Sequence, residues 1–138
     1  MTTPLRLRVI NSVEAIGQAN ATVMAWLEAN HIPPAPAVLA SLALEELVTN
    51  CIKYGYPDSN EHVIDVDMRV DDGNLVLRFA DDGREFNPLE VPAPDLSLPL
   101  EQRPIGGLGL FLLKTMADNV TYERRGGMNC LTLIKRIE

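Results

Sequence analysis

The sequence is poor in the features that mark several large classes of protein. Only two cysteines and two histidines occur in 138 residues, and 12 basic against 19 acidic side chains leave a net charge of −7. An acidic chain without a basic stripe argues against nucleic acid as the main partner. A small anionic ligand is not excluded, because a backbone loop or a helix N-terminus can bind phosphate locally.

The N-terminus and the few cysteines bear on where the protein works. No long apolar run follows residues 1–6, so we expect neither a signal peptide nor a membrane span. Cys51 and Cys130 lie far apart, in apolar surroundings and without metal-ligand spacing. This is typical of buried thiols in a reducing cytoplasm, with a disulfide as the less favoured alternative. His31 and His62 are isolated, and we assign neither a metal role. We therefore expect a cytoplasmic protein without a membrane or nucleic-acid partner.

Hydrophobic periodicity predicts a single α+β domain over residues 1–138. Alternating apolar and charged side chains are typical of half-buried strands, and Asp-Gly or Gly-Gly pairs indicate the hairpin turns between them. Apolar residues at helical spacing predict two helices early in the chain, of which the second is apolar around most of its circumference. Strands are predicted near residues 5–9, 64–70, 75–81, 120–125 and 128–137, and helices from residues 11–12 onward, at 35–53 and at 110–117.

The order β, α, α, β, β, loop, α, β, β favours one architecture. Hairpin connections imply a mostly antiparallel, mixed sheet with its helices on one face, a two-layer α/β sandwich. The connection over residues 83–105 contains five prolines and is too long to be a simple linker in a small domain. We therefore expect that segment to be functional.

The first candidate site is Glu46 and Asn50, which lie four residues apart and so on one face of the predicted helix. Taken alone, such a pair is most often a solvated helix face. An Asn oxygen suits Mg²⁺, whose other ligands would be phosphates and water, and a Glu one turn away could deprotonate an attacking hydroxyl. Lys53 could approach a phosphate from the end of the same helix, with a surface lysine as the alternative.

The second candidate is Asp81-Asp82-Gly83, at the end of a strand. A plain turn is the simple interpretation, since Asp-Gly is a common turn pair. Strand parity places Asp81 on the core side, however, where an unpaired carboxylate is costly. A carboxylate there could accept a hydrogen bond from the exocyclic amine of adenine, and Gly83 would let the backbone approach the base.

The third candidate is Gly106-Gly107-Leu108-Gly109, immediately before an apolar helix. Open glycine amides at a helix N-terminus favour a bound phosphate. Arg103 could reach a terminal phosphate, with an exposed loop arginine as the alternative. The proline-rich residues 83–105 would then form a lid over a nucleotide.

Together these three elements resemble the boxes of the GHKL ATPase class, which has the Bergerat fold. Residues 42–56 look like its N-box, residues 81–83 like its first glycine box and residues 106–112 like its second. The resemblance covers roughly residues 39–136, and the ordered conjunction is far more specific than any single box. Within the class, the chain looks most like the small stand-alone anti-sigma-factor serine kinases.

The resemblance implies a role for each site residue. Glu46 would be the catalytic base, Asn50 would hold Mg²⁺ and Asp81 would read the adenine of ATP or ADP. A threonine on the last strand often assists at adenine, and Thr132 is the candidate. One departure is Glu85, which stands where many members of the class have a second glycine, and the Phe86-Asn87-Pro88 that follows is a marker of the stand-alone branch.

The resemblance also implies the reaction. We expect an ATP- and Mg²⁺-dependent serine/threonine protein kinase whose substrate is a STAS-domain anti-anti-sigma protein, with a sigma factor as a further partner and a homodimer as the assembly. Neither histidine lies on an upstream helical hairpin, so we expect the phosphate acceptor to come from another protein. The alternative is a non-catalytic, nucleotide-gated module that sequesters a sigma factor or another regulator, and an α+β domain without a nucleotide is the third interpretation.

Overall fold

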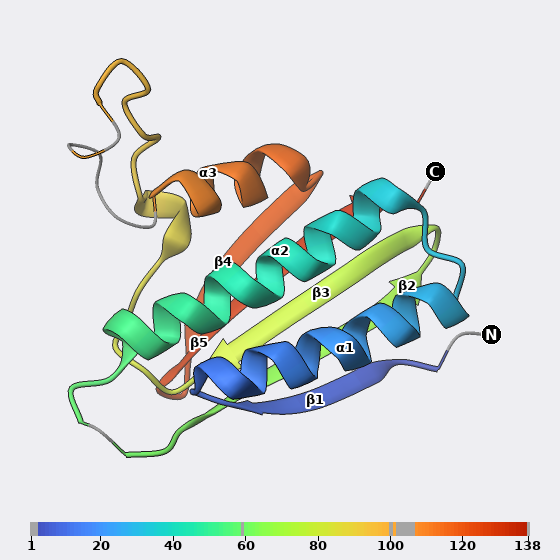
Figure 1. Ribbon diagram of the computed structural model, residues 1–138, viewed down its shortest axis with the longest axis horizontal. Coiled ribbons are helices and arrows are strands. Elements are labelled where there is room, and N and C mark those ends of the chain that lie inside the picture. Colours follow the sequence, from blue (N-terminus) through green and yellow to red (C-terminus); the bar gives the residue numbers. More distant parts are fainter. Residues whose placement is uncertain (1–2, 59, 100, 102–106, 138) are drawn as a thin grey trace.

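The computed structural model describes residues 3–58, 60–99, 101 and 107–137 (Figure 1). It confirms the α+β class, because one five-stranded sheet carries the helices on one of its faces. The elements follow in the order β1 (Leu5–Ile10), α1 (Val13–Ala29), α2 (Pro34–Asn50), the π-helical turn η1 (Cys51–Gly55), β2 (Val63–Asp71), β3 (Asn74–Asp81), the 3₁₀ turn η2 (Pro88–Glu90), α3 (Gly107–Met116), β4 (Asn119–Arg125) and β5 (Met128–Arg136).

The strand order in the sheet is β1-β2-β3-β5-β4, and every neighbouring pair is antiparallel. The expectation of a mixed sheet is therefore wrong for the described strands. The β2–β3 and β4–β5 pairs are hairpins, whereas β5 inserts between β3 and β4. This insertion sets Asp81 at the end of β3 directly opposite Asn129 on β5.

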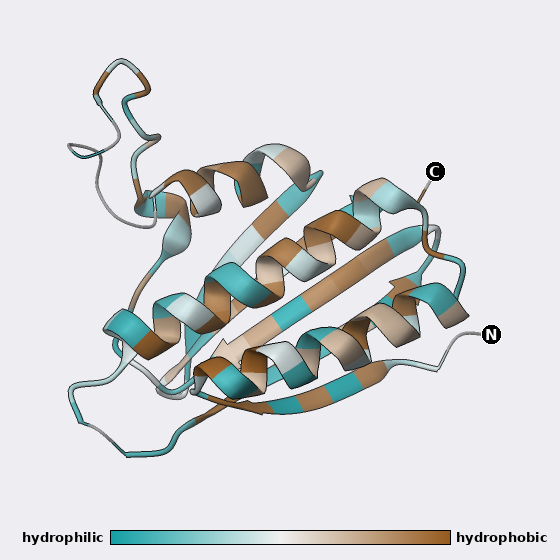
Figure 2. Cartoon of the chain, viewed as in Figure 1, coloured by the Kyte–Doolittle hydropathy of each residue, from teal (hydrophilic) through white to brown (hydrophobic). Residues whose placement is uncertain are grey.

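The core lies between the sheet and the helices. Alternate strand residues such as Ile64, Leu77 and Leu133 are completely or almost completely buried and face the helices. The intervening positions carry charges that pair across strands on the opposite face, for example Arg6 with Asp67 at 3.6 Å. Figure 2 shows this alternation as successive brown and teal segments along β1.

Helix α1 begins where the sequence predicts. The Ser12 hydroxyl accepts a hydrogen bond from the Ala15 N–H at 3.2 Å, which satisfies one of the free amides at the helix start. Val23 and Leu27 bury its inner face. The indole N–H of Trp26 donates to the Thr3 carbonyl at 2.9 Å and fixes the segment before β1.

Helix α2 ends earlier than the predicted residue 53. Its α-helical hydrogen bonding stops at Asn50, and the chain continues through the wider π turn Cys51–Gly55. A π turn inserts into a helix at an energetic cost and occurs frequently at functional sites. Here it carries Cys51, Tyr54 and Gly55 to the wall of a cavity.

The segment Pro34–Gly55 is long and apolar enough, by length and composition, to cross a membrane. In this fold the same composition serves another purpose. Leu39, Leu44 and Val48 are fully buried in the domain core, and the helix packs on α1, α3 and β3. A central core helix needs this apolar circumference, which accounts for the composition of the segment.

Candidate active site

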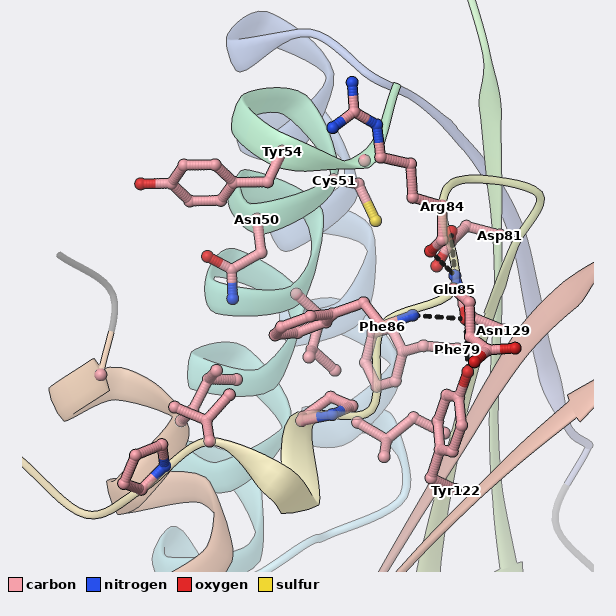
Figure 3. A pocket seen from close by; sticks show the side chains of 18 of the residues that line it. Asn50, Cys51, Tyr54, Phe79, Asp81, Arg84, Glu85, Phe86, Tyr122 and Asn129 are labelled. Carbon is pink, nitrogen blue, oxygen red and sulfur yellow. Dashed lines mark hydrogen bonds between the residues drawn. The ribbon is translucent and has the colours of Figure 1, made fainter. Parts of the chain in front are cut away.

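A cavity of about 490 Å³ opens where three parts of the chain meet (Figure 3). The C-terminal end of α2 with η1 forms one wall, the residues after β3 form a second, and β4 and β5 form the floor. Its lining is mainly apolar, with a few polar side chains, as is typical of a small-molecule site. The polar and aromatic lining residues labelled in Figure 3 are Asn50, Cys51, Tyr54, Phe79, Asp81, Arg84, Glu85, Phe86, Tyr122 and Asn129.

Asn50 contributes a polar group without a partner to this cavity. It lines the wall, and its Nδ2 atom is buried without a hydrogen-bond partner in the part of the chain that the structure describes. A buried amide that lacks a partner is destabilising, and a ligand would remove that penalty. The prediction that Asn50 faces a ligand therefore has a physical basis in the structure.

Glu46 lies one turn before Asn50 and reaches the start of α3. A side chain at Gly109 would overlap with the Glu46 carboxylate, because a Cβ built there falls within contact distance of Cδ and both oxygens. A side chain at this position would therefore require the Glu46 carboxylate to move. The structure thus brings the first and third candidate sites together, although they lie more than 60 residues apart in the sequence.

The surroundings of Glu46 change its acidity. Burial raises the pKa of its carboxyl above the ordinary value, the charge of Glu45 raises it further, and the charge of Lys53 opposes both. A carboxylate with a raised pKa is a better proton acceptor near neutral pH. Lys53 itself is exposed and lies outside the cavity lining, so its described contribution is this electrostatic one.

Asp81 is held at the cavity wall by two hydrogen bonds. Its Oδ1 accepts from the Gly83 N–H at 2.9 Å and from Asn129 Nδ2 at 3.1 Å. Gly83 is buried, and a Cβ there would lie 2.7 Å from the Gly55 carbonyl oxygen. The Arg84 N–H donates to the same carbonyl at 2.8 Å, so the chain after β3 crosses close to η1. This crossing requires glycine at position 83.

Cys51 and Tyr56 stand next to this carboxylate. Burial raises the pKa of the Cys51 thiol well above its ordinary value, and the charge of Asp81 adds to the effect. Burial and then Asp81 act in the same way on the Tyr56 hydroxyl, whose ring stacks on His62 with centroids 3.7 Å apart. Both groups are therefore neutral at physiological pH. Both cysteines are free, and each is half-buried.

The proline-rich segment after Asp81 covers one side of the cavity. Phe86, Pro88 and Val91 line it, and the Lys114 ammonium on α3 donates to the Val91 carbonyl at 2.9 Å. Gly107 is buried at the cavity and Leu108 is 43% exposed. Arg103 and Gly106, which the sequence predicts at the phosphates, lie outside the described residues.

Thr132 does not line the cavity, so its predicted place at an adenine base is wrong in this structure. Its neighbours Leu131 and Leu133 are buried toward the helices, which puts Thr132 on the other face of β5. Asn129 occupies the cavity side instead. The period of two along β5 puts Asn129 in phase with the two leucines, and that signal was available in the sequence.

These features define a class of protein, an α+β domain whose central helix, strand-end carboxylate and glycine-containing helix start surround one cavity. A sequence profile of the histidine kinase-like ATPase domain matches residues 10–135, so the chain belongs to that family. The GHKL class expected from the three boxes is confirmed, and with it the use of a nucleotide.

The proteins similar to this chain include two curated kinases and one solved structure. The serine/threonine-protein kinase BtrW of Bordetella bronchiseptica is 28% identical over 67% of this chain and 66% of its own length. The serine-protein kinase RsbW of Listeria monocytogenes is 31% identical over 57% of this chain and 53% of its own length. The match thus spans between about half and two-thirds of these relatives. The crystal structure of the RsbU and RsbW domains of a Mycobacterium tuberculosis protein superposes with a TM-score of 0.70 over 99% of this chain and 33% of that one, at 20% identity.

Proposed function

We propose that this protein is an ATP-dependent serine/threonine protein kinase of a bacterial partner-switching system. The observation that carries the proposal is the contact between Glu46 and Gly109, because it puts a carboxylate of raised pKa beside the glycine-containing start of α3. A proton acceptor and a phosphate-binding helix start are the two components that transfer to a hydroxyl needs side by side. The names of the curated relatives support the same activity.

The nucleotide would lie across the cavity. Asp81 would accept a hydrogen bond from the adenine amine, and the apolar walls would enclose the base. The amides at Gly107, Leu108 and Gly109 would face the phosphates, where the helix dipole favours negative charge. Residues 83–105 would act as the lid, and Arg103 within it and Gly106 just after it would contribute at the phosphates.

Magnesium fits the donor set of the cavity. Asn50 would supply the neutral oxygen of its side-chain amide as a ligand, its unpaired Nδ2 could donate to a phosphate oxygen, and phosphates and water would complete the coordination. When bound, Mg²⁺ would neutralise phosphate charge. The described residues contain no cluster of three or more His, Cys, Asp or Glu side chains that could hold a metal, so the nucleotide itself would have to provide ligands.

Transfer would proceed from the γ-phosphate to a protein hydroxyl. Glu46 would take the hydroxyl proton as the oxygen forms its bond to phosphorus, and the bond to the β-phosphate oxygen would break to release ADP. Since little covalent chemistry falls to the protein, most of the rate would come from positioning and charge neutralisation.

The substrate that we propose is a serine or threonine on a STAS-domain anti-anti-sigma protein, with a sigma factor as a second partner, a homodimer as the assembly and the cytoplasm as the site of action. The printed names of the relatives support one part of this proposal, the serine or threonine acceptor. The alternative, a module that binds nucleotide and sequesters a sigma factor without transfer, uses the same cavity but does not need Glu46.

The test is to incubate the protein with γ-labelled ATP and a STAS-domain protein encoded next to it. We expect label on a hydroxyl side chain of the STAS protein. Label that appears only as inorganic phosphate, or stays in ATP although ATP binds, would favour the binding module. A thermal shift with Mg-ATP and Mg-ADP is the control for binding, and no stabilisation by either nucleotide would contradict both functions.

A further inference from the structure

Asn129 is an unusual residue in this fold because it is polar and buried. With 7% of its surface exposed, it is the only polar or charged side chain in the buried class within the described part of the chain. It comes from β5, directly opposite Asp81 on β3. A buried amide is costly unless its hydrogen bonds are made, so its partners indicate its purpose.

The Asn129 amide makes four hydrogen bonds, and all of them converge on one corner of the cavity (Figure 3). Its Nδ2 donates to Asp81 Oδ1 at 3.1 Å and to the Arg84 carbonyl at 2.7 Å. Its Oδ1 accepts from the Phe86 N–H at 3.1 Å and from the Tyr122 hydroxyl at 2.6 Å. An amide has two donors and two acceptor sites, so these bonds use its full capacity.

Because all four hydrogen-bonding positions of the Asn129 amide are used, Asn129 cannot bind a ligand directly. It must therefore act through the groups to which it is hydrogen-bonded. Asp81 receives two donors on the same oxygen, from Gly83 and Asn129. The terminal torsion of an Asp side chain is otherwise broad, so these two bonds select one orientation of the carboxylate. Its Oδ2 retains the capacity to accept a hydrogen bond from a ligand in the cavity, where the Cys51 thiol is a weak donor neighbour.

We propose that Asn129 is a positioning residue that makes the cavity select a purine with a 6-amino group, by fixing Asp81 in the orientation that accepts from that amine. The proposal rests on the nucleotide-binding function proposed above. A fixed carboxylate favours a 6-amino purine, because the amine donates a hydrogen bond to it. It disfavours a 6-oxo purine, because the oxo group and the carboxylate are both hydrogen-bond acceptors. The same amide is hydrogen-bonded to the backbone of Arg84 and Phe86. Asn129 therefore orients Asp81 and also positions the start of the segment that covers the cavity.

The test compares two ligands that differ only in the amine. The dissociation constants of ATP and of purine riboside triphosphate, which lacks the 6-amino group, are measured for the wild type and for Asn129→Asp. This substitution keeps the shape and the acceptor oxygen but removes both donors. We expect wild type to prefer ATP by about tenfold or more, as for a hydrogen bond to a charged group, and the ratio to approach one in the variant.

Two further variants separate positioning from folding. Asn119→Asp makes the same charge change at an exposed asparagine on the neighbouring strand β4 and should leave the ratio unchanged. Asn129→Ala removes the amide without adding charge, and we expect it to lower the ratio as Asn129→Asp does, so either variant alone decides the matter if the other does not fold. A general loss of stability weakens both ligands equally and cancels in the ratio.

The outcomes distinguish the two proposals. If both folded Asn129 variants bind both ligands more weakly but keep the wild-type ratio, Asn129 is only structural and the inference is wrong. If wild type binds ATP without preferring it over purine riboside triphosphate, nucleotide binding stands and the positioning role falls. If wild type binds neither ligand, the function proposed for the cavity fails first.

Discussion

The carboxylate of Glu46 lies against the backbone of Gly109, so that a side chain at position 109 would have to displace it. The absence of a side chain at position 109 leaves room for this charged group beside the helix start. This contact explains why a glycine stands inside a helix, where it is intrinsically unfavourable. The contact joins a proton acceptor to the helix start at which phosphates would bind.

Gly109→Ala is the first prediction. The added methyl group must displace the Glu46 carboxylate, and because a shift of about 1 Å at a reacting group can cost about 100-fold, we expect a loss of that order in phosphoryl transfer. Single-turnover transfer measures it. The control is Gly17→Ala on the exposed side of α1, where no atom lies within 4 Å of the added Cβ. It should stabilise the fold by about 0.5–1 kcal/mol and leave transfer unchanged, and equal transfer in both variants would refute the packing argument.

The second prediction concerns the pH dependence of stability. The pKa of Glu46 is raised by burial and then by Glu45, so the folded protein holds this proton more tightly than the unfolded chain does. The ionised form therefore destabilises the fold above the folded-state pKa, and this effect disappears as the pH falls below the ordinary value of 4.5. Glu46→Gln should raise Tm at pH 7 and lose that advantage in acid. Exposed Glu61→Gln is the control, and a lower Tm for Glu46→Gln at pH 7 would contradict the prediction.

Cys51 gives a third prediction. Its pKa is raised by burial and by the charge of Asp81, so the thiolate that reacts with alkylating reagents is scarce. In a Cys130→Ser background, which leaves one thiol to count, native protein at pH 8 should react with iodoacetamide far more slowly than the same protein in denaturant. Equal rates in the two states would show that burial does not protect the thiol.

The face assignment of β5 gives a fourth prediction. Asp81→Asn should weaken ATP binding by about tenfold or more, since it replaces a charged acceptor at the cavity. Thr132→Val alters the opposite face of the sheet and should change the ATP dissociation constant by less than about twofold, as an ordinary surface substitution does. Calorimetric titration measures both. A larger effect from Thr132→Val than from Asp81→Asn would mean that the β5 register is different.

The sequence predicted the fold well where the signal is local. Alternation in the strands and the apolar circumference of α2 gave the element order, and the three boxes gave the family. The sequence did not predict the π turn at Cys51–Gly55, because the same residues are compatible with an α-helix.

The candidate site was harder to predict where it depends on pairing between distant strands. Asn129 meets Asp81 only because β5 inserts beside β3, and no local pattern around Asn129 announces that register. The prediction that Thr132 lies at the adenine rested on residue type and did not use the face of β5 on which this side chain lies. The contact of Glu46 with Gly109 is likewise tertiary, and the sequence could place the two residues in separate boxes but not side by side.

The most direct test of the central claim is the transfer rate of Glu46→Gln under single-turnover conditions, with γ-labelled ATP and the STAS-domain substrate. The substitution removes the proton acceptor and keeps the shape, whereas Glu45→Gln changes the exposed neighbour on the same helix and serves as the matched control. We predict that Glu46→Gln lowers transfer by about 100-fold or more, the usual contribution of a general base, while ATP still binds and Glu45→Gln transfers normally. Transfer by Glu46→Gln at the wild-type rate would show that Glu46 is not the base.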